Sequence, residues 1–182
     1  HVAMLVETPC VVVGRFDERY LKIPRAVLIT VMKAHQKYFP VEDSQGKLLP
    51  CFLSVANNPA PEARDNIRAG NERVLLARFE DAVFFFEEDT KQPLDSRLEA
   101  LKGVTFQKGM GSLYDKTQRL RALACAVAEA LGYSAEERAQ TDRAALLAKT
   151  DLVTSMVFEL TELQGEIGKD YALLQGEPDA VA

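Results

Sequence analysis

Two short apolar runs in the first third of the chain constrain the fold most. CVVVGRF (10–16) and LLPCFLSVA (48–56) are typical of buried β-strands, and the second follows the turn sequence SQGK (44–47). We expect the two runs to pair with each other in one sheet. Pro50 has no backbone N–H to donate, so it favours the start of its strand or a sheet edge.

Helical spacing accounts for the rest of the first half. Pro24 suits the first turn of a helix over AVLITVMKAH (26–35), because the missing N–H costs little there. From Pro61 the chain turns helical, and NERVLLARFEDAVFFFEED (71–89) predicts a long amphipathic helix that Pro93 ends. The apolar positions with helical spacing in that helix are Val74, Leu75, Phe79, Val83 and Phe86.

Helix signals also dominate the second half. Gly132 is expected just beyond the end of a helix over LRALACAVAEALG (120–132). Ser134 caps the next helix, and Glu137, three residues later, completes a capping box. One further long helix is expected from 143 to 163.

These patterns together predict an α+β fold. The expected organisation is a mixed α/β region at 1–103, packed on an all-helical region at 104–182. Its 182 residues suit one large domain or two small ones.

Composition and charge exclude several function classes. Hydrophobic residues make up 47% of the chain, which argues against disorder, and no apolar run approaches the ~20 residues that span a bilayer. A net charge of −5 means that any RNA contact must come from a local patch. Cys10, Cys51 and Cys125 form no CxxC pair, so we expect reduced core residues in a cytoplasmic protein that does not associate with membranes.

The sequence contains no recognisable catalytic motif. A Ser-His-Asp or Cys-His arrangement would need His35 as its base, because the only other histidine is the terminal His1. No serine or cysteine has a nucleophile-elbow context, and GMGS (109–112) is too short for a dinucleotide fingerprint. We therefore expect no catalytic residue in this chain.

A row of oxygen-bearing side chains occurs at helical spacing in the predicted helix 143–163 and just beyond it. Such a row fits either a hard-cation site or a solvated, ion-paired face, and without histidine we expect the latter and no metal. The row consists of Asp151, Ser155, Glu159, Glu162 and Glu166.

Cations outnumber acids between residues 104 and 121, where Asp115 is the one carboxylate. These cations either pair with the carboxylate row or face a phosphate backbone, and both interpretations stay open. They are Lys108, Lys116, Arg119 and Arg121.

The segment HQKYF (35–39) allows two interpretations. As a helix C-terminus, it places His35 and Lys37 where cations complement the helix dipole, and it sends Tyr38 and Phe39 into the core. As a small cationic and aromatic surface, it could stack on a base or hold a partner.

Six blocks of sequence stand out, in order, between about residue 5 and residue 177. The blocks are GRFDERYLKIP, VLITVMKAHQKYFP, GKLLPCFLSVANN, GNERVLLARFEDAVFFFEED, FQKGMGSLYDKTQRL and LLAKTDLVTSMVFELTELQGEIGKDYA. Together they resemble the β subunit of the bacterial heterotetrameric glycyl-tRNA synthetase. The chain departs from that family's pattern at Thr8, Ser112 and Ile167, where the family often has tryptophan, threonine and methionine.

The resemblance implies a part in the ATP-dependent attachment of glycine to its tRNA. In that family the catalytic core, with its ATP and Mg, lies on a separate α subunit, and the longer β subunit mainly recognises tRNA. The resemblance therefore also implies that the helical region 104–182 is HD-like and truncated at its C-terminal end. The implied partners are the α subunit, glycine tRNA and a second β subunit, with no cofactor in this chain. His35, Gln36 and Lys37 would then contact tRNA or a neighbouring domain.

Two rival functions accompany this resemblance. One is a scaffold between domains or subunits without tRNA contact, for which exposed apolar side chains at Phe84, Phe85 and Tyr114 would argue. The other is an HD-type metal phosphohydrolase, because the family's β subunit carries a region related to those enzymes. LLAKTDLVT (146–154) would match the His-Asp helix, with Thr150 in place of the histidine and Asp151 retained, so the implied metal cage is broken.

Overall fold

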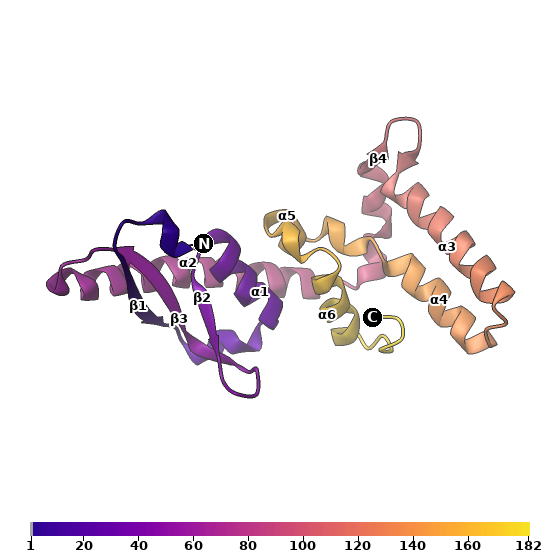
Figure 1. Ribbon diagram of the computed structural model, residues 1–182. Coiled ribbons are helices and arrows are strands. Elements are labelled where there is room, and N and C mark those ends of the chain that lie inside the picture. The colour runs from indigo at the N-terminus through magenta and orange to yellow at the C-terminus, as the bar shows by residue number, and fades with distance from the viewer. Residues whose placement is uncertain (1) are drawn as a thin grey trace. The chain divides into compact units, whose positions relative to one another are not determined.

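The computed structural model describes residues 2–182, so His1 lies outside the described residues (Figure 1). It confirms the predicted α+β class, with a small antiparallel sheet near the N-terminus and helices after it. The chain forms two compact units, which divide at Phe86/Glu87. The expected division at 103/104 falls inside the second unit, because η5 (Leu94–Gly103) buries Leu94 and Leu101 in that unit's core.

The first unit is built on a three-stranded antiparallel sheet. Its order is β1 (Pro9–Arg15), β3 (Leu48–Asn57), β2 (Phe39–Glu42), which confirms the predicted pairing of the two apolar runs. Of the two positions expected for Pro50, the start of its strand is the one observed and the sheet edge is not, since β3 is the central strand. Pro50 is tolerated as its third residue because the register with β2 shifts between Pro40 and Glu42, opposite this proline.

The helix α2 (Arg64–Thr90) covers one face of this sheet. Val12, Phe52 and Ser54 alternate along the strands and are buried on that face. The Asn71 side-chain amide of α2 donates to the Ser54 hydroxyl at 2.9 Å. The helix is less regularly amphipathic than its spacing predicts, because Val74 stays 46% exposed.

An aromatic cluster completes the core of the first unit. Phe79 of α2 packs edge-on against Phe16 with ring centroids 5.1 Å apart, and it lies 5.3 Å from the ring of Tyr20. Gly14 of β1 lies directly against the Phe52 ring, so that a Cβ at this position would overlap the ring. The sequence needs glycine there because side chain and backbone approach so closely.

The connecting helix of the first unit has two parts. Pro24 precedes α1 (Arg25–Thr30) as predicted, and the helix continues as a π-helical turn, η3 (Val31–His35). Its apolar face, including Val27 and Met32, is fully buried.

The second unit begins with η5, which leads to a short hairpin and an antiparallel helix pair. The hairpin is β4 (Thr105–Gln107) with β5 (Gly111–Ser112), and α3 (Leu113–Ala130) lies beside α4 (Ala135–Leu147) (Figure 1). Both predicted end signals are confirmed. Ser134 and Glu137 form a reciprocal capping box, and Gly132 follows α3 with φ +73°.

The single helix expected at 143–163 is wrong. The chain breaks into α4, η6 (Thr150–Val153), α5 (Ser155–Glu159) and η7 (Thr161–Leu163), and a separate α6 (Glu166–Leu174) follows. Polar side chains take over the backbone groups that a continuous helix would pair. The hydroxyl of Thr154 accepts from the Val157 N–H at 3.2 Å and starts a new helix at that point. No described helix is long and apolar enough to span a bilayer.

Candidate nucleic-acid interface

All four predicted cations lie on the β4–β5 hairpin and the first half of α3, and three of them, Lys108, Lys116 and Arg119, are considered together first. Lys108 is exposed in the hairpin turn, where Gly109 and Gly111 adopt positive φ values of +82° and +84°. Lys116 and Arg119 lie one helical turn apart on α3. We call these three, with Lys102 at the end of η5, the hairpin–α3 surface.

Aromatic rings support two of the lysines on this surface. The Lys116 ammonium lies 3.8 Å from the centre of the Phe106 ring, and the Lys102 ammonium lies 4.7 Å from the centre of the Tyr114 ring. Lys102 also donates to Glu99 at 2.8 Å, and this hydrogen bond raises the pKa of the lysine. Such contacts hold an ammonium in place while leaving it charged.

Asp115, the one acid between residues 104 and 121, is already engaged as a helix cap. Its carboxylate accepts from the Ser112 backbone N–H at 2.8 Å and from the Ser112 hydroxyl at 2.9 Å. These bonds hold the pKa of Asp115 below its usual range. None of Lys108, Lys116 and Arg119 forms an ion pair within residues 2–182.

Arg121 is separated from the other cations by its partner. Its guanidinium binds Asp142 of α4 in a bidentate manner, with Nε–Oδ1 at 2.8 Å and a second nitrogen to Oδ2 at 2.7 Å. The pair joins α3 to α4, and Arg121 holds the pKa of Asp142 below its usual range. The Cys125 thiol donates to the same carboxylate at 3.6 Å, and burial raises the pKa of this thiol.

The segment HQKYF lies in the first unit, at the end of η3. His35 and Lys37 are exposed, Gln36 is half-buried, and the Lys37 ammonium donates to the Ala34 carbonyl at 2.8 Å. Lys37 has φ +58°, an uncommon conformation for a residue with a side chain. This is the geometry expected of a cationic helix C-terminus.

The aromatic part of HQKYF divides between core and surface. Tyr38 stacks on Phe52 with centroids 4.7 Å apart, and burial raises the pKa of its hydroxyl. The expectation that Phe39 enters the core is wrong, since Phe39 is 41% exposed. The reason is its register opposite Leu53, which places it on the sheet face away from α2.

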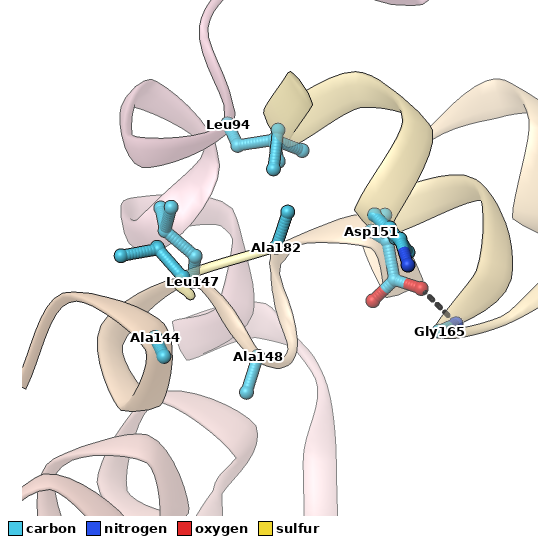
Figure 2. Close-up of a pocket in the computed structure, with 11 residues that line it drawn as sticks. Leu94, Ala144, Leu147, Ala148, Asp151, Gly165 and Ala182 are labelled. Atoms are coloured by element: carbon cyan, nitrogen blue, oxygen red, sulfur yellow. Dashed lines mark hydrogen bonds between the residues drawn. The ribbon is translucent and has the colours of Figure 1, made fainter. Parts of the chain in front are cut away.

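The expected carboxylate row does not exist as a row, because the chain breaks between its members. Asp151 is 3% exposed and accepts from the Gly165 N–H at 2.5 Å (Figure 2), and burial raises the pKa of its carboxyl. Thr150, fully buried, donates to the Leu147 carbonyl at 2.8 Å.

Asp151 borders a pocket of about 230 Å³ whose other walls include Leu94, Ala144, Leu147 and Ala148 (Figure 2). Gly168 approaches Asp151 so closely that a Cβ there would lie 3.1 Å from the Asp151 Cβ. No group of three or more His, Cys, Asp or Glu side chains within residues 2–182 is placed to hold a metal ion. The Asp151 carboxylate therefore fixes the start of α6 through its hydrogen bond to the Gly165 N–H.

Comparison with known proteins identifies the family. The family described as glycyl-tRNA synthetase beta subunit matches residues 1–182. The chain belongs to this family. Glycine–tRNA ligase beta subunits from Desulforamulus reducens, Synechocystis sp. and Clostridioides difficile are 50%, 49% and 51% identical to it over 181 residues, which is 100% of this chain. It spans about a quarter of the length of these curated relatives, 26%, 25% and 26% respectively.

For this beta-subunit segment, sequence reasoning missed one cation and misplaced another. Lys102 belongs to the hairpin–α3 surface but was not predicted. Its spacing of three residues from Glu99 is that of an ordinary ion pair within one helix, so the sequence provides no reason to select it. Arg121 looked equivalent to its neighbours in sequence, although its partner Asp142 lies on the next helix. His35, Gln36 and Lys37 lie in the other unit from the hairpin–α3 surface.

Proposed function

We propose that this segment contacts glycine tRNA as part of the beta subunit of a glycine–tRNA ligase, and that it has no catalytic centre of its own. It would support the ATP-dependent joining of glycine to tRNA, with ATP and Mg used by the α subunit. The protein would act in the cytoplasm, with the α subunit and a second β subunit as partners.

The observation that carries this proposal is a set of cations on the hairpin–α3 surface that form no ion pair within residues 2–182. These are Lys108, Lys116 and Arg119; the carboxylate of Asp115 beside them caps α3, and the charge of Arg119 helps to lower its pKa. Because the chain as a whole carries a net charge of −5, attraction to a phosphate backbone has to arise from such a local concentration. In this proposal Arg121 holds α3 against α4.

The test uses the full-length beta subunit, assembled with its α subunit, and a salt titration of glycine tRNA binding. Lys108→Ala and Arg119→Ala should each flatten the salt dependence by about one unit of slope. Each phosphate contact contributes about 0.9 to the slope of log K against log [salt], so the loss of one contact should weaken tRNA binding roughly fivefold near physiological salt. Lys47→Ala is the matched control, since Lys47 is an exposed lysine of the other unit. If Lys108→Ala and Arg119→Ala behave like Lys47→Ala, the surface does not meet RNA.

The segment HQKYF is the second place where tRNA or a neighbouring domain would make contact. The exposed His35 and Lys37, with the half-buried Gln36 between them, support this assignment. Replacing His35 and Lys37 together by alanine in the assembled enzyme should lower glycylation without unfolding the chain. Unchanged glycylation with unchanged folding would exclude the segment from binding.

A scaffold without direct tRNA contact is the alternative function. Phe84 is 58% exposed and favours a protein neighbour, whereas Tyr114 is half-buried beneath Lys102. In that case Lys108→Ala and Arg119→Ala would leave tRNA affinity unchanged. The HD-type phosphohydrolase has the least support, because Thr150 and Asp151 are engaged in backbone hydrogen bonds.

A further inference from the structure

The tip of the β4–β5 hairpin carries a methionine beside the cations of the hairpin–α3 surface. Met110 lies two residues after Lys108, and the second unit leaves it 48% exposed. Between residues 102 and 119, a range that the structure describes completely, Met110 is the one exposed large apolar side chain. It therefore adds an apolar group to a surface that otherwise presents charge.

The backbone of the hairpin tip is constrained on both sides of Met110. A β-turn ends at this residue, whose N–H donates to the Gln107 carbonyl at 2.9 Å. Gly109, the third residue of the turn, has φ +82°, as a type II turn requires. Gly111, which follows Met110, lies so close to the Asp115 carboxylate that a Cβ there would overlap it. Because the tip is held in this way, less entropy is lost when its side chain binds a partner.

The two aromatic rings of the hairpin–α3 surface are already in use. The Lys116 ammonium lies over the Phe106 ring, and the Lys102 ammonium lies over the Tyr114 ring. Both rings are half-buried, and each has an ammonium group on one of its faces. A ligand that approaches these cations therefore meets Met110 as the accessible apolar side chain.

A nucleic-acid base has the chemistry that matches this combination of groups. The phosphate next to a base is attracted by cations such as Lys108 and Arg119, which form no ion pair within residues 2–182. The face of the base is an aromatic ring, and the thioether of methionine makes favourable contacts with such rings. Bases inside an RNA duplex are stacked on both faces, so the contact requires an unpaired base or one at the end of a helix.

We infer that Met110 packs on the face of an unpaired or helix-terminal base of the bound tRNA, while Lys108 contacts a neighbouring phosphate. This inference rests on the proposed function and adds to it the kind of contact that the hairpin tip makes. Apolar packing on a base displaces no counterions from the phosphates. Met110 therefore contributes affinity without contributing to the salt dependence of binding.

The test repeats the salt titration of glycine tRNA binding with the full-length beta subunit assembled with its α subunit. Met110→Ala should weaken binding roughly fivefold, as expected for the loss of one sulfur–ring contact, with the slope of log K against log [salt] unchanged. Met110→Tyr should keep the affinity of the unmodified enzyme, because a tyrosine ring also stacks on a base. Leu131→Ala is the matched control, since Leu131 is 64% exposed at the end of α3, outside the hairpin–α3 surface.

These variants separate the inference from the proposed function. If Lys108→Ala flattens the slope while Met110→Ala binds like Leu131→Ala, the surface meets phosphate but Met110 meets no base. If neither Lys108→Ala nor Met110→Ala differs from its control, the inference and the proposed function both fail. Weaker binding of Met110→Ala with a flattened slope would mean that the substitution displaces Lys108, and it would overturn the inference.

Photocrosslinking in the same assembled enzyme identifies what Met110 contacts. The photoreactive residue p-benzoylphenylalanine, introduced in place of Met110, should crosslink to glycine tRNA under ultraviolet light. The modified nucleotide, located by primer extension, should be unpaired or at the end of a helix. A crosslink to the interior of a duplex, to the α subunit or to another part of the beta subunit would overturn the inference, as would the absence of a crosslink to tRNA.

Discussion

Asp89→Ala should destabilise the second unit more than any other single substitution in α2. Asp89 is 2% exposed near the end of that helix and accepts from the Ser155 N–H at 2.9 Å and the Met156 N–H at 2.8 Å. It also accepts from the Tyr171 hydroxyl at 3.2 Å and pairs with Arg97 at 3.4 Å. Four partners from three later segments thus converge on one side chain.

The magnitude follows from what Asp89→Ala leaves behind. The Arg97 side chain is 12% exposed, so that its charge would remain buried without its carboxylate. Breaking a buried pair in this way costs about 3–5 kcal/mol, and the two orphaned N–H groups at the start of α5 add to the loss. We expect a decrease of about 4 kcal/mol in the free energy of unfolding, a large share of the roughly 5–15 kcal/mol typical of a domain.

Urea unfolding, followed by circular dichroism, measures this loss, with Asp81→Ala as the control. Asp81 lies on the same helix, is 60% exposed, and faces Arg78 at 3.9 Å, so its removal should cost less than about 1 kcal/mol. Asp89→Ala should also speed amide exchange at Ser155 and Met156. If the two variants unfold at the same urea concentration, Asp89 does not organise the second unit.

Three further predictions concern single residues. Arg121→Ala should lower stability by about 1 kcal/mol in urea unfolding, since the pair with Asp142 is one-third exposed. Because the pKa of Asp142 is lowered in the folded chain, that contribution should be present above its unfolded pKa of about 3.9 and vanish as pH falls through the lower folded value; a pH series of unfolding curves checks this. Lys37→Gly should raise the free energy of unfolding by about 1 kcal/mol at most, because glycine relieves the strain of φ +58°, and a rise in the midpoint of thermal unfolding measures it. Gly14→Ala should cost about 2 kcal/mol or more, because its methyl group would overlap the Phe52 ring, and a fall in the melting temperature measures it.

The elements that sequence predicted correctly are mainly those set by neighbouring residues. Ser134 and Glu137 form their capping box within one helical turn. Gly132 adopts the left-handed conformation that ends α3, with φ +73°, and this depends only on its own backbone. Local chemistry decides both features, so the sequence contains the necessary information. The β1–β3 pairing joins residues as far apart as Pro9 and Asn57, and it was predictable because both runs have the apolar pattern of buried strands.

The break of the helix expected at 143–163 depends on a distant residue. Asp89 binds the Ser155 and Met156 N–H groups from 66 and 67 positions earlier in the chain. Thr154 is a local N-cap of the new helix start, but nothing within the segment indicates that a remote carboxylate will also bind the two N–H groups there. The missed element is a tertiary effect that overrides local propensity.

The same distinction governs the candidate site. Lys116 and Arg121 differ little by sequence, yet one lies over the Phe106 ring and the other is held by Asp142 across the α3–α4 turn. A substitution at Arg121 would therefore confuse loss of stability with loss of binding. Lys108 has no ion-pair partner within residues 2–182, so Lys108→Ala removes one charge from the surface without breaking an ion pair. Lys108 is for this reason the position at which tRNA binding and scaffold function are most clearly separated.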